Sequence, residues 1–337
     1  MSTALKCESY IFDPRPNYPL LLTAKRYWSS TTSSTETAGY TLVFAHATGF
    51  QKEQYEPTIE DLYRLLPPHV FIQEAWSVDA PNSGEAADLN EEYLRWGYDS
   101  TFGWQEYARG LHALLTGLGT GVDVDFAKRR LILVGHSFGA VAQVLALTFQ
   151  PQIQPEQLIL LEITCYRPED PRSKVNYLAE GSEKRRDIWP SNEAALSQFQ
   201  SRPPWKLWDP RALQLFVEHG LRPLPSIEYP DKQGVTLRCT RRQETATYRD
   251  PHGIATTYNT IGRLSKRVPI HLVYGSIANH IPRPMINDFL DNGIGRENIA
   301  SLRHIDGAGH LIIQTHPTEC AGVILDILKQ GQQSARL

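Results

Sequence analysis

The apolar residues in the first half of the chain fall into short continuous runs separated by segments with a helical pattern. The runs at 41–45, 131–134 and 158–161 are typical of strands that are buried on both faces. Apolar residues with helical spacing follow at 59–66, and a helix rich in small residues is predicted at 140–149. Because strands that alternate with helices form βαβ units, this pattern predicts an α/β fold with a mostly parallel sheet flanked by helices.

Weaker signals extend this pattern along the chain. The polar stretch at 29–37 cannot bury a face and is predicted to be a loop, and a long loop is predicted after residue 78. Further strands are predicted at 6–12, 20–28, 70–78, 269–275 and 299–305. Further helices are predicted at 104–118, 192–199, 209–219, 284–292 and 318–329.

The α/β alternation stops between residues 166 and 266. Prolines recur in this stretch, and it contains no apolar strand run comparable to the others. We therefore predict a mainly helical cap at 166–266, inserted into a core that is formed by 1–165 and 267–337. Without the insert, the remaining chain has a length typical of one α/β domain.

Composition and charge exclude several classes of protein. The chain is 41% hydrophobic and 21% charged, and its net charge of −3 gives no electrostatic basis for binding nucleic acid. Its four cysteines, Cys7, Cys165, Cys239 and Cys320, have neither zinc-ligand spacing nor the density of a disulfide scaffold, so we expect no metal and no cofactor. Because no secretion signal or long apolar stretch is visible, we also expect a soluble protein without a membrane span.

The first chemical motif is GHSFG at residues 135–139, which directly follows the apolar run at 131–134. A strand, a sharp turn with glycines on both sides of a serine, and a following helix together make a nucleophile elbow. The motif therefore predicts that Ser137 is a nucleophile and that the N–H of Phe138 helps to hold an oxyanion.

A serine nucleophile needs a base and a second oxyanion donor. His310 lies in a glycine-containing loop between the last predicted strand and the last predicted helix, where a base is needed in this architecture. The loop after the first buried strand contains Thr48, which we predict to be the second N–H donor; a simple tight turn is the alternative. His46 is expected to shape this loop and to contribute to the substrate site.

These motifs resemble those of the α/β-hydrolase superfamily. The order and spacing of residues 46–49, 135–139 and 307–310 carry the resemblance. Within the superfamily, the segments at 202–205, 208–211, 217–221 and 234–239 resemble a capped group of fungal peroxisomal hydrolases. This group includes toxin-biosynthesis hydrolases and the acyl-CoA hydrolase of mycophenolic acid biosynthesis. The resemblance implies an α/β-hydrolase fold, serine hydrolase chemistry and, from the family alone, a possible homodimer.

The acid of the predicted triad departs from the commonest superfamily pattern. Residues 274–280 occupy the usual acid position but contain no carboxylate, and Asn279 cannot stabilise an imidazolium by charge. The resembling group places its acid after the strand that follows the nucleophile helix, where Glu162 stands in this chain. Glu162 is therefore predicted to orient His310, and a structural cap or an ion pair with the insert is the alternative.

The chain ends in Ala335, Arg336 and Leu337, which resemble the S-K-L type of peroxisomal address. This ending predicts a peroxisomal location and an import receptor as partner, and a frayed polar tail is the alternative.

Together, these features predict a peroxisomal acyl-CoA hydrolase that acts on a small acyl substrate through an acyl-enzyme. Trp205 and Trp208 are candidates for lining the acyl pocket, with the core of the insert as the alternative, and the basic runs at 184–186 and 241–242 are candidates for CoA phosphates. A carboxylesterase, an acyltransferase or cyclase acting on a polyketide-type intermediate, and a non-catalytic ligand-binding scaffold are the competing hypotheses.

Overall fold

The computed structural model describes residues 5–29, 39–169 and 177–334. Its centre is an eight-stranded sheet in which the two strands β1 and β2 at one edge run antiparallel to their neighbours and the remaining strands are parallel. In spatial order, the strands are β1 (Leu5–Phe12), β2 (Leu22–Ser29), β4 (Ile72–Val78), β3 (Tyr40–Ala45), β5 (Arg130–His136), β6 (Gln157–Leu161), β10 (Ile270–Gly275) and β11 (Ile299–Ile305). The predicted α/β fold is therefore confirmed.

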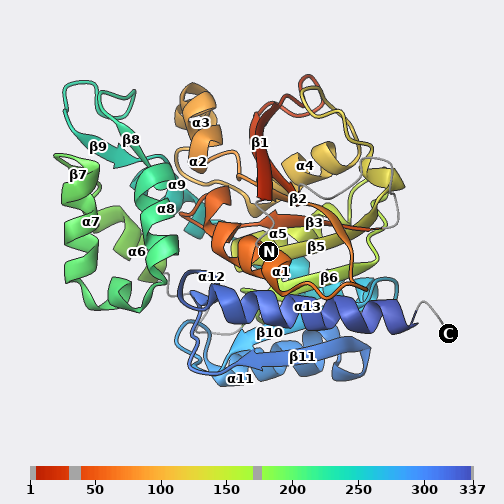
Figure 1. The fold of residues 1–337 in the computed structure, drawn as a ribbon. Coiled ribbons are helices and arrows are strands. Elements are labelled where there is room, and N and C mark those ends of the chain that lie inside the picture. The colour runs from red at the N-terminus through yellow and green to blue at the C-terminus, as the bar shows by residue number, and fades with distance from the viewer. Residues whose placement is uncertain (1–4, 30–38, 170–176, 335–337) are drawn as a thin grey trace.

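Helices cover both faces of the sheet because alternate residues of its central strands point to opposite sides. In β3, Leu42 and Phe44 join one apolar cluster, whereas Val43 and Ala45 join the other. The first cluster contains α1 (Glu56–Leu65) and α13 (Pro317–Ser334), which lie together in front of the sheet in Figure 1. The second contains helices α4 (Trp104–Leu115), α5 (Phe138–Ala146), α10 (Gly253–Leu264) and α11 (Arg283–Asp288).

A separate group of elements lies beyond one edge of this core, at the left of Figure 1. It has its own aromatic cluster, which includes Trp189, Phe199 and Phe216, and a three-stranded antiparallel sheet in the order β7-β9-β8. Its elements are α6 (Tyr177–Lys184), β7 (Ile188–Trp189), α7 (Asn192–Ser201), α8 (Pro210–Gly220), β8 (Leu221–Pro223), β9 (Val235–Leu237) and α9 (Arg241–Tyr248).

The structure differs from the sequence predictions in three places. The long loop predicted after residue 78 contains two short helices, α2 (Gly84–Leu89) and α3 (Glu91–Gly97). The predicted insert includes the small sheet, which its short strands did not reveal. Helix α10 falls within the predicted 166–266 insert, but it packs on α5 and shares the apolar cluster of the core. The last predicted helix begins near residue 317 as expected, after the short α12 (Ile312–Thr315).

Among the described residues, every helix is either too short or too polar to pass through a lipid bilayer.

Candidate active site

Ser137 lies at the tip of a sharp turn between β5 and α5. Its φ of 53° is in the left-handed region that residues with a side chain rarely adopt, which marks a strained position. The flanking glycines are required by close backbone packing: a Cβ at Gly139 would lie 2.1 Å from the carbonyl oxygen of Ala45, and one at Gly135 would lie 2.5 Å from the Cα of Ala140. The sequence motif at 135–139 thus folds into the predicted strand, turn and helix.

The three predicted triad side chains meet at the carboxyl ends of the parallel strands. The Ser137 Oγ lies 3.0 Å from His310 Nε2, and His310 Nδ1 lies 3.1 Å from a carboxylate oxygen of Glu162. They come from three separate loops, after β5, β6 and β11. The structure thus forms a continuous hydrogen-bonded chain from the hydroxyl through the imidazole to the carboxylate, which is the geometry that activates a serine.

Glu162 is held in a second strained turn, with a φ of 47°. Its N–H donates to the carbonyl of Val273, and its Oε1 accepts the N–H of Gly275 at 2.5 Å, so both contacts come from β10. Burial raises the pKa of the Glu162 carboxyl, while the hydrogen bond from Gly275 opposes that shift. Among the described residues, the Glu162 carboxylate bonds to His310 and to the Gly275 N–H and forms no ion pair with the insert.

His310 is neutral in this arrangement, because burial lowers its pKa to about 3. The carboxylate of Glu162 can only accept, so the imidazole proton is assigned to Nδ1 and Nε2 is left to accept the Ser137 proton. The main chain of His310 is also held: its N–H donates to Asn279 Oδ1 at 2.8 Å, and its carbonyl lies 2.8 Å from His136 Nε2. The base is therefore fixed in both position and tautomer.

Thr48 and Phe138 lie where an oxyanion hole is expected. Phe138 is the first residue of α5, so its N–H has no acceptor within the helix. Thr48 is buried in the loop after β3, beside the elbow, whose Gly139 packs against Ala45 and His46. These positions place two candidate N–H donors beside the Ser137 elbow.

His46 is buried behind the Thr48 turn and is held by the protein main chain. Its Nε2 accepts the N–H of Ala80 at 2.9 Å, and its Nδ1 lies 2.8 Å from the carbonyl of Ala47, to which it donates. Burial also lowers the pKa of His46, so the ring is neutral. Both ring nitrogens bond to the protein, so His46 shapes the loop that carries Thr48, and its contribution to the substrate site stays a prediction.

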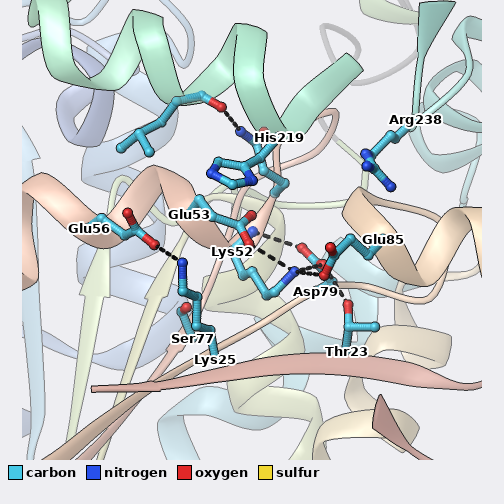
Figure 2. Close-up of polar contacts among 12 residues, drawn as sticks. Thr23, Lys25, Lys52, Glu53, Glu56, Ser77, Asp79, Glu85, His219 and Arg238 are labelled. Atoms are coloured by element: carbon cyan, nitrogen blue, oxygen red, sulfur yellow. Dashed lines mark hydrogen bonds and ion pairs between the residues drawn. The ribbon is translucent and has the colours of Figure 1, made fainter. Parts of the chain in front are cut away.

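A buried charge network surrounds Lys52, which follows the loop that carries Thr48 (Figure 2). The ammonium of Lys52 is fully buried and lies within 2.9 Å of carboxylate oxygens of Asp79, Glu53 and Glu85. Asp79 also accepts the Lys52 N–H at 2.7 Å and the Thr23 hydroxyl at 2.6 Å. Burial lowers the pKa of Lys52, but Asp79 and Glu53 outweigh this effect and hold it above its usual value. A buried charge surrounded by this many partners fixes the segment that follows Thr48.

Sequence reasoning missed one group in contact with the nucleophile. The hydroxyl of Thr164 is buried and lies 3.0 Å from the Ser137 Oγ. Because Ser137 donates its only proton to His310, Thr164 is placed to donate to the serine oxygen. The residue lies two positions after Glu162 in the same loop, and no sequence pattern distinguishes it from an ordinary loop threonine.

The group of elements from α6 to α9 contacts the loops of the site directly. Side-chain amides of Gln51 and Gln54 donate to the carbonyls of Leu215 and Ala212 in α8, each at 3.0 Å. At the N-terminal end of α8, the N–H of the capping residue Asp209 donates to the carbonyl of Gln314 in α12. Helix α8 therefore bridges the loop that carries Thr48 and the segment that follows His310.

The predicted pocket aromatics lie mainly inside this group. Trp208 is buried in its apolar cluster, and Trp205 is half-buried and stacks on Phe199 with ring centroids 4.3 Å apart. Trp208 also meets Phe50, which follows the Thr48 turn, at 5.7 Å. Their placement fits the alternative of a core for the insert, and a contact with substrate stays a prediction.

The basic groups suggested for CoA phosphates are largely paired within the protein. Arg185 forms an ion pair with Glu244 at 2.5 Å, and Arg241 forms one with Asp187. Arg242 forms two ion pairs, with Asp99 at 2.9 Å and with Glu228 at 3.1 Å. These pairs leave little free positive charge at 185 and 241–242. Residues 335–337 lie outside the described residues, so the structure gives no view of the predicted address.

Across the described residues, no group of three or more histidine, cysteine or acidic side chains is arranged to hold a metal ion.

The chain is similar to known proteins in both sequence and structure. Residues 42–323 match the model of the alpha/beta hydrolase family. Type I acyl-CoA thioesterase mpaH of Penicillium roqueforti is 27% identical over 204 residues, which cover 59% of this chain and 43% of that protein. The protein of the same name from Penicillium brevicompactum is also 27% identical to this chain, over the same shares of both proteins. The match thus spans less than half the length of these curated relatives.

Solved structures share the fold over nearly the whole chain. The peroxisomal alpha-beta-hydrolase Lpx1 of Saccharomyces cerevisiae superposes with a TM-score of 0.72 at 20% identity, covering 98% of this chain and 89% of that one. E-2-(acetamidomethylene)succinate hydrolase superposes with a TM-score of 0.69 at 16% identity, covering 96% of this chain and all of that one. At these identities, the similarity establishes the fold alone.

Proposed function

The chain belongs to the alpha/beta hydrolase family, as its sequence motifs predicted, and from this premise we propose that it is a serine hydrolase. Ser137 is the nucleophile, His310 the base and Glu162 the acid. The observation that carries the proposal is the unbroken chain of contacts at 3.0 and 3.1 Å from the serine hydroxyl to the carboxylate, with the serine on a strained elbow.

The geometry supports a two-step acyl transfer. As the Ser137 Oγ attacks the acyl carbonyl, its proton moves to His310 Nε2, and the Phe138 and Thr48 N–H groups stabilise the negative charge that develops on the carbonyl oxygen. The imidazolium then gives its proton to the departing thiolate or alkoxide, which leaves an acyl ester on Ser137. A water molecule, deprotonated by the same imidazole, attacks this ester and releases the carboxylic acid and the free serine.

We further propose that the substrate is an acyl thioester, with an acyl-CoA as the leading candidate. The support is the 27% identity to proteins named acyl-CoA thioesterase. We also propose that elements α6 to α9 form a cap over the site, because α8 bridges the two loops on either side of the triad. In this proposal, residues 1–165 and 267–337 form the core and residues 166–266 are the insert that carries the cap. Helix α10 belongs to the insert in sequence but packs on the core.

A panel of paired substrates tests the proposal. Purified protein is assayed with CoA thioesters and p-nitrophenyl esters of the same acyl groups, from two to sixteen carbons, and the release of thiol or phenol is followed. We expect at least one thioester to have the higher kcat/KM, although the ester has the better leaving group. Consistently faster ester cleavage would favour a carboxylesterase, and acyl transfer to an added alcohol in preference to water would favour an acyltransferase. If no substrate is turned over and Ser137 resists acylation, the protein is a binding scaffold.

We also propose a peroxisomal location, supported by the ending Ala335-Arg336-Leu337 and by the location named for a structural neighbour. A fluorescent protein fused to the N-terminus leaves this ending free. In fungal cells, the fusion is expected to coincide with a peroxisomal marker and to become diffuse when residues 335–337 are deleted. As a control, residues 332–337 attached to an unrelated reporter should move that reporter to the same particles. Unchanged particles after the deletion would contradict the address.

A further inference from the structure

The loop that follows β10 holds both the acid and the base of the site, although it contains no carboxylate. Gly275, the last residue of β10, donates its N–H to the Glu162 carboxylate, and near the end of the loop the side chain of Asn279 accepts the N–H of His310. Between them, the Ser276 hydroxyl accepts the N–H of Gly307 at 3.0 Å. Hydrogen bonds therefore link the loop at 275–280 to the loop that carries His310.

The last residue of this loop, His280, lies directly on the ring of the base. The imidazoles of His280 and His310 are stacked, with centroids 3.8 Å apart and planes 28° from parallel. His280 is half-buried, and within the described part of the chain its ring nitrogens have no hydrogen-bond partner. Its contact with His310 is therefore made through the face of the ring and not through a nitrogen.

We propose that His280 is a positioning residue for the base: its aromatic face holds the His310 ring in the plane between Ser137 and Glu162 and stabilises the imidazolium that forms during acyl transfer. This inference rests on the proposed function and extends it to a residue outside the triad. The edges of the His310 ring are held by hydrogen bonds to Ser137 and Glu162, but these two in-plane contacts only weakly resist rotation of the ring out of that plane. A stacked ring blocks that rotation.

The electrostatics of the stack favour the transition state over the resting state. His280 itself is neutral, because burial and the neighbouring His310 lower its pKa to about 3, against an opposing effect of Glu162. A neutral aromatic face attracts a cation that lies over it, whereas it gains much less from a neutral ring. The imidazolium exists only while the serine proton is in transit, so the stack contributes mainly to the rate of the chemical step and little to substrate binding.

Two substitutions separate the aromatic face from simple packing. His280→Phe keeps a flat aromatic face and removes the nitrogens, whereas His280→Leu keeps apolar volume and removes the face. Ile277→Ala is the matched control, because Ile277 lies in the same loop and is 52% exposed. Thermal unfolding of all four proteins verifies that the loop still folds.

The readout is the second-order rate at which an alkyl fluorophosphonate labels Ser137, which requires no knowledge of the natural substrate. In this reaction, the serine oxygen forms a bond to phosphorus, fluoride leaves, and the serine proton passes to His310. We expect His280→Leu to label about 3- to 20-fold more slowly than the wild type, and His280→Phe and Ile277→Ala to stay within about twofold. With a turned-over thioester, the loss should appear in kcat with KM unchanged.

Each outcome decides a separate question. Equal labelling of the Leu and Phe variants would overturn the proposal, whether both are fast or both are slow, and so would a change confined to KM. Failure of the wild type itself to label would count against the serine hydrolase function and not against the role of His280 within it.

Discussion

The Ser137→Ala variant is expected to lose about 10⁴- to 10⁶-fold in kcat on any acyl substrate that the wild type cleaves. The variant removes the atom that forms the acyl-enzyme, and the hydrogen-bonded pair of His310 and Glu162 cannot replace it, because neither side chain can form the same ester intermediate. The residual rate would come from substrate binding and from the N–H groups of Thr48 and Phe138, which can still hold an oxyanion formed by direct attack of water.

The fold should survive this change. Alanine and serine meet the same backbone strain at a φ of 53°, and among the described residues the lost hydroxyl bonds to His310 and Thr164 alone. Thermal unfolding and steady-state kinetics are measured together, with Ser201→Ala as a control, because the Ser201 hydroxyl bonds only locally in an exposed position of α7. A Ser137→Ala protein that retains more than about 1% of wild-type kcat would contradict the assignment of the nucleophile.

Local sequence patterns predicted the parts of the site whose geometry is local. The apolar run at 131–134, the glycines at 135 and 139 and the small-residue helix are consecutive, so their conformation depends mainly on one another. The close approach of Gly139 to the main chain of Ala45 is the physical reason for the second glycine. The parallel sheet followed in the same way from apolar runs separated by helical segments, and the family model confirms the fold.

Features that depend on contacts distant in sequence could not be predicted in this way. The stack of His280 on His310 joins residues of two different loops, and the bond from Thr164 to Ser137 spans 27 positions. The hydrogen bond from the Ala80 N–H to His46 Nε2 also could not be predicted, because Ala80 follows a different strand, 34 positions away in the sequence. The helices α2 and α3 were missed because their segments are short and polar, and they depend on contacts with other parts of the chain.

Replacing Glu162 with glutamine is expected to lower kcat by about 10³- to 10⁴-fold while leaving the fold intact. The new amide can still accept the Gly275 N–H with its oxygen, but it then presents an NH₂ donor to His310. That donor requires His310 Nδ1 to be the acceptor and places the ring proton on Nε2, where it faces the Ser137 hydroxyl. An imidazole in this tautomer cannot take up the serine proton, and no negative charge remains to stabilise an imidazolium.

The pH dependence and stability of the variant distinguish a catalytic acid from a structural one. In the wild type, kcat/KM should fall as the pH is lowered through the raised pKa of Glu162, because the carboxylate is the active form, and the glutamine variant should lose this limb. Since burial of the carboxylate makes the folded protein bind its proton more tightly, ionisation at neutral pH costs stability, and the variant should unfold at an equal or higher temperature.

Glu156→Gln, which breaks an exposed pair with Arg130, is the matched control and should leave kcat unchanged. Near-normal kcat in Glu162→Gln would remove Glu162 from the triad, and loss of activity together with a lower unfolding temperature would make its role structural.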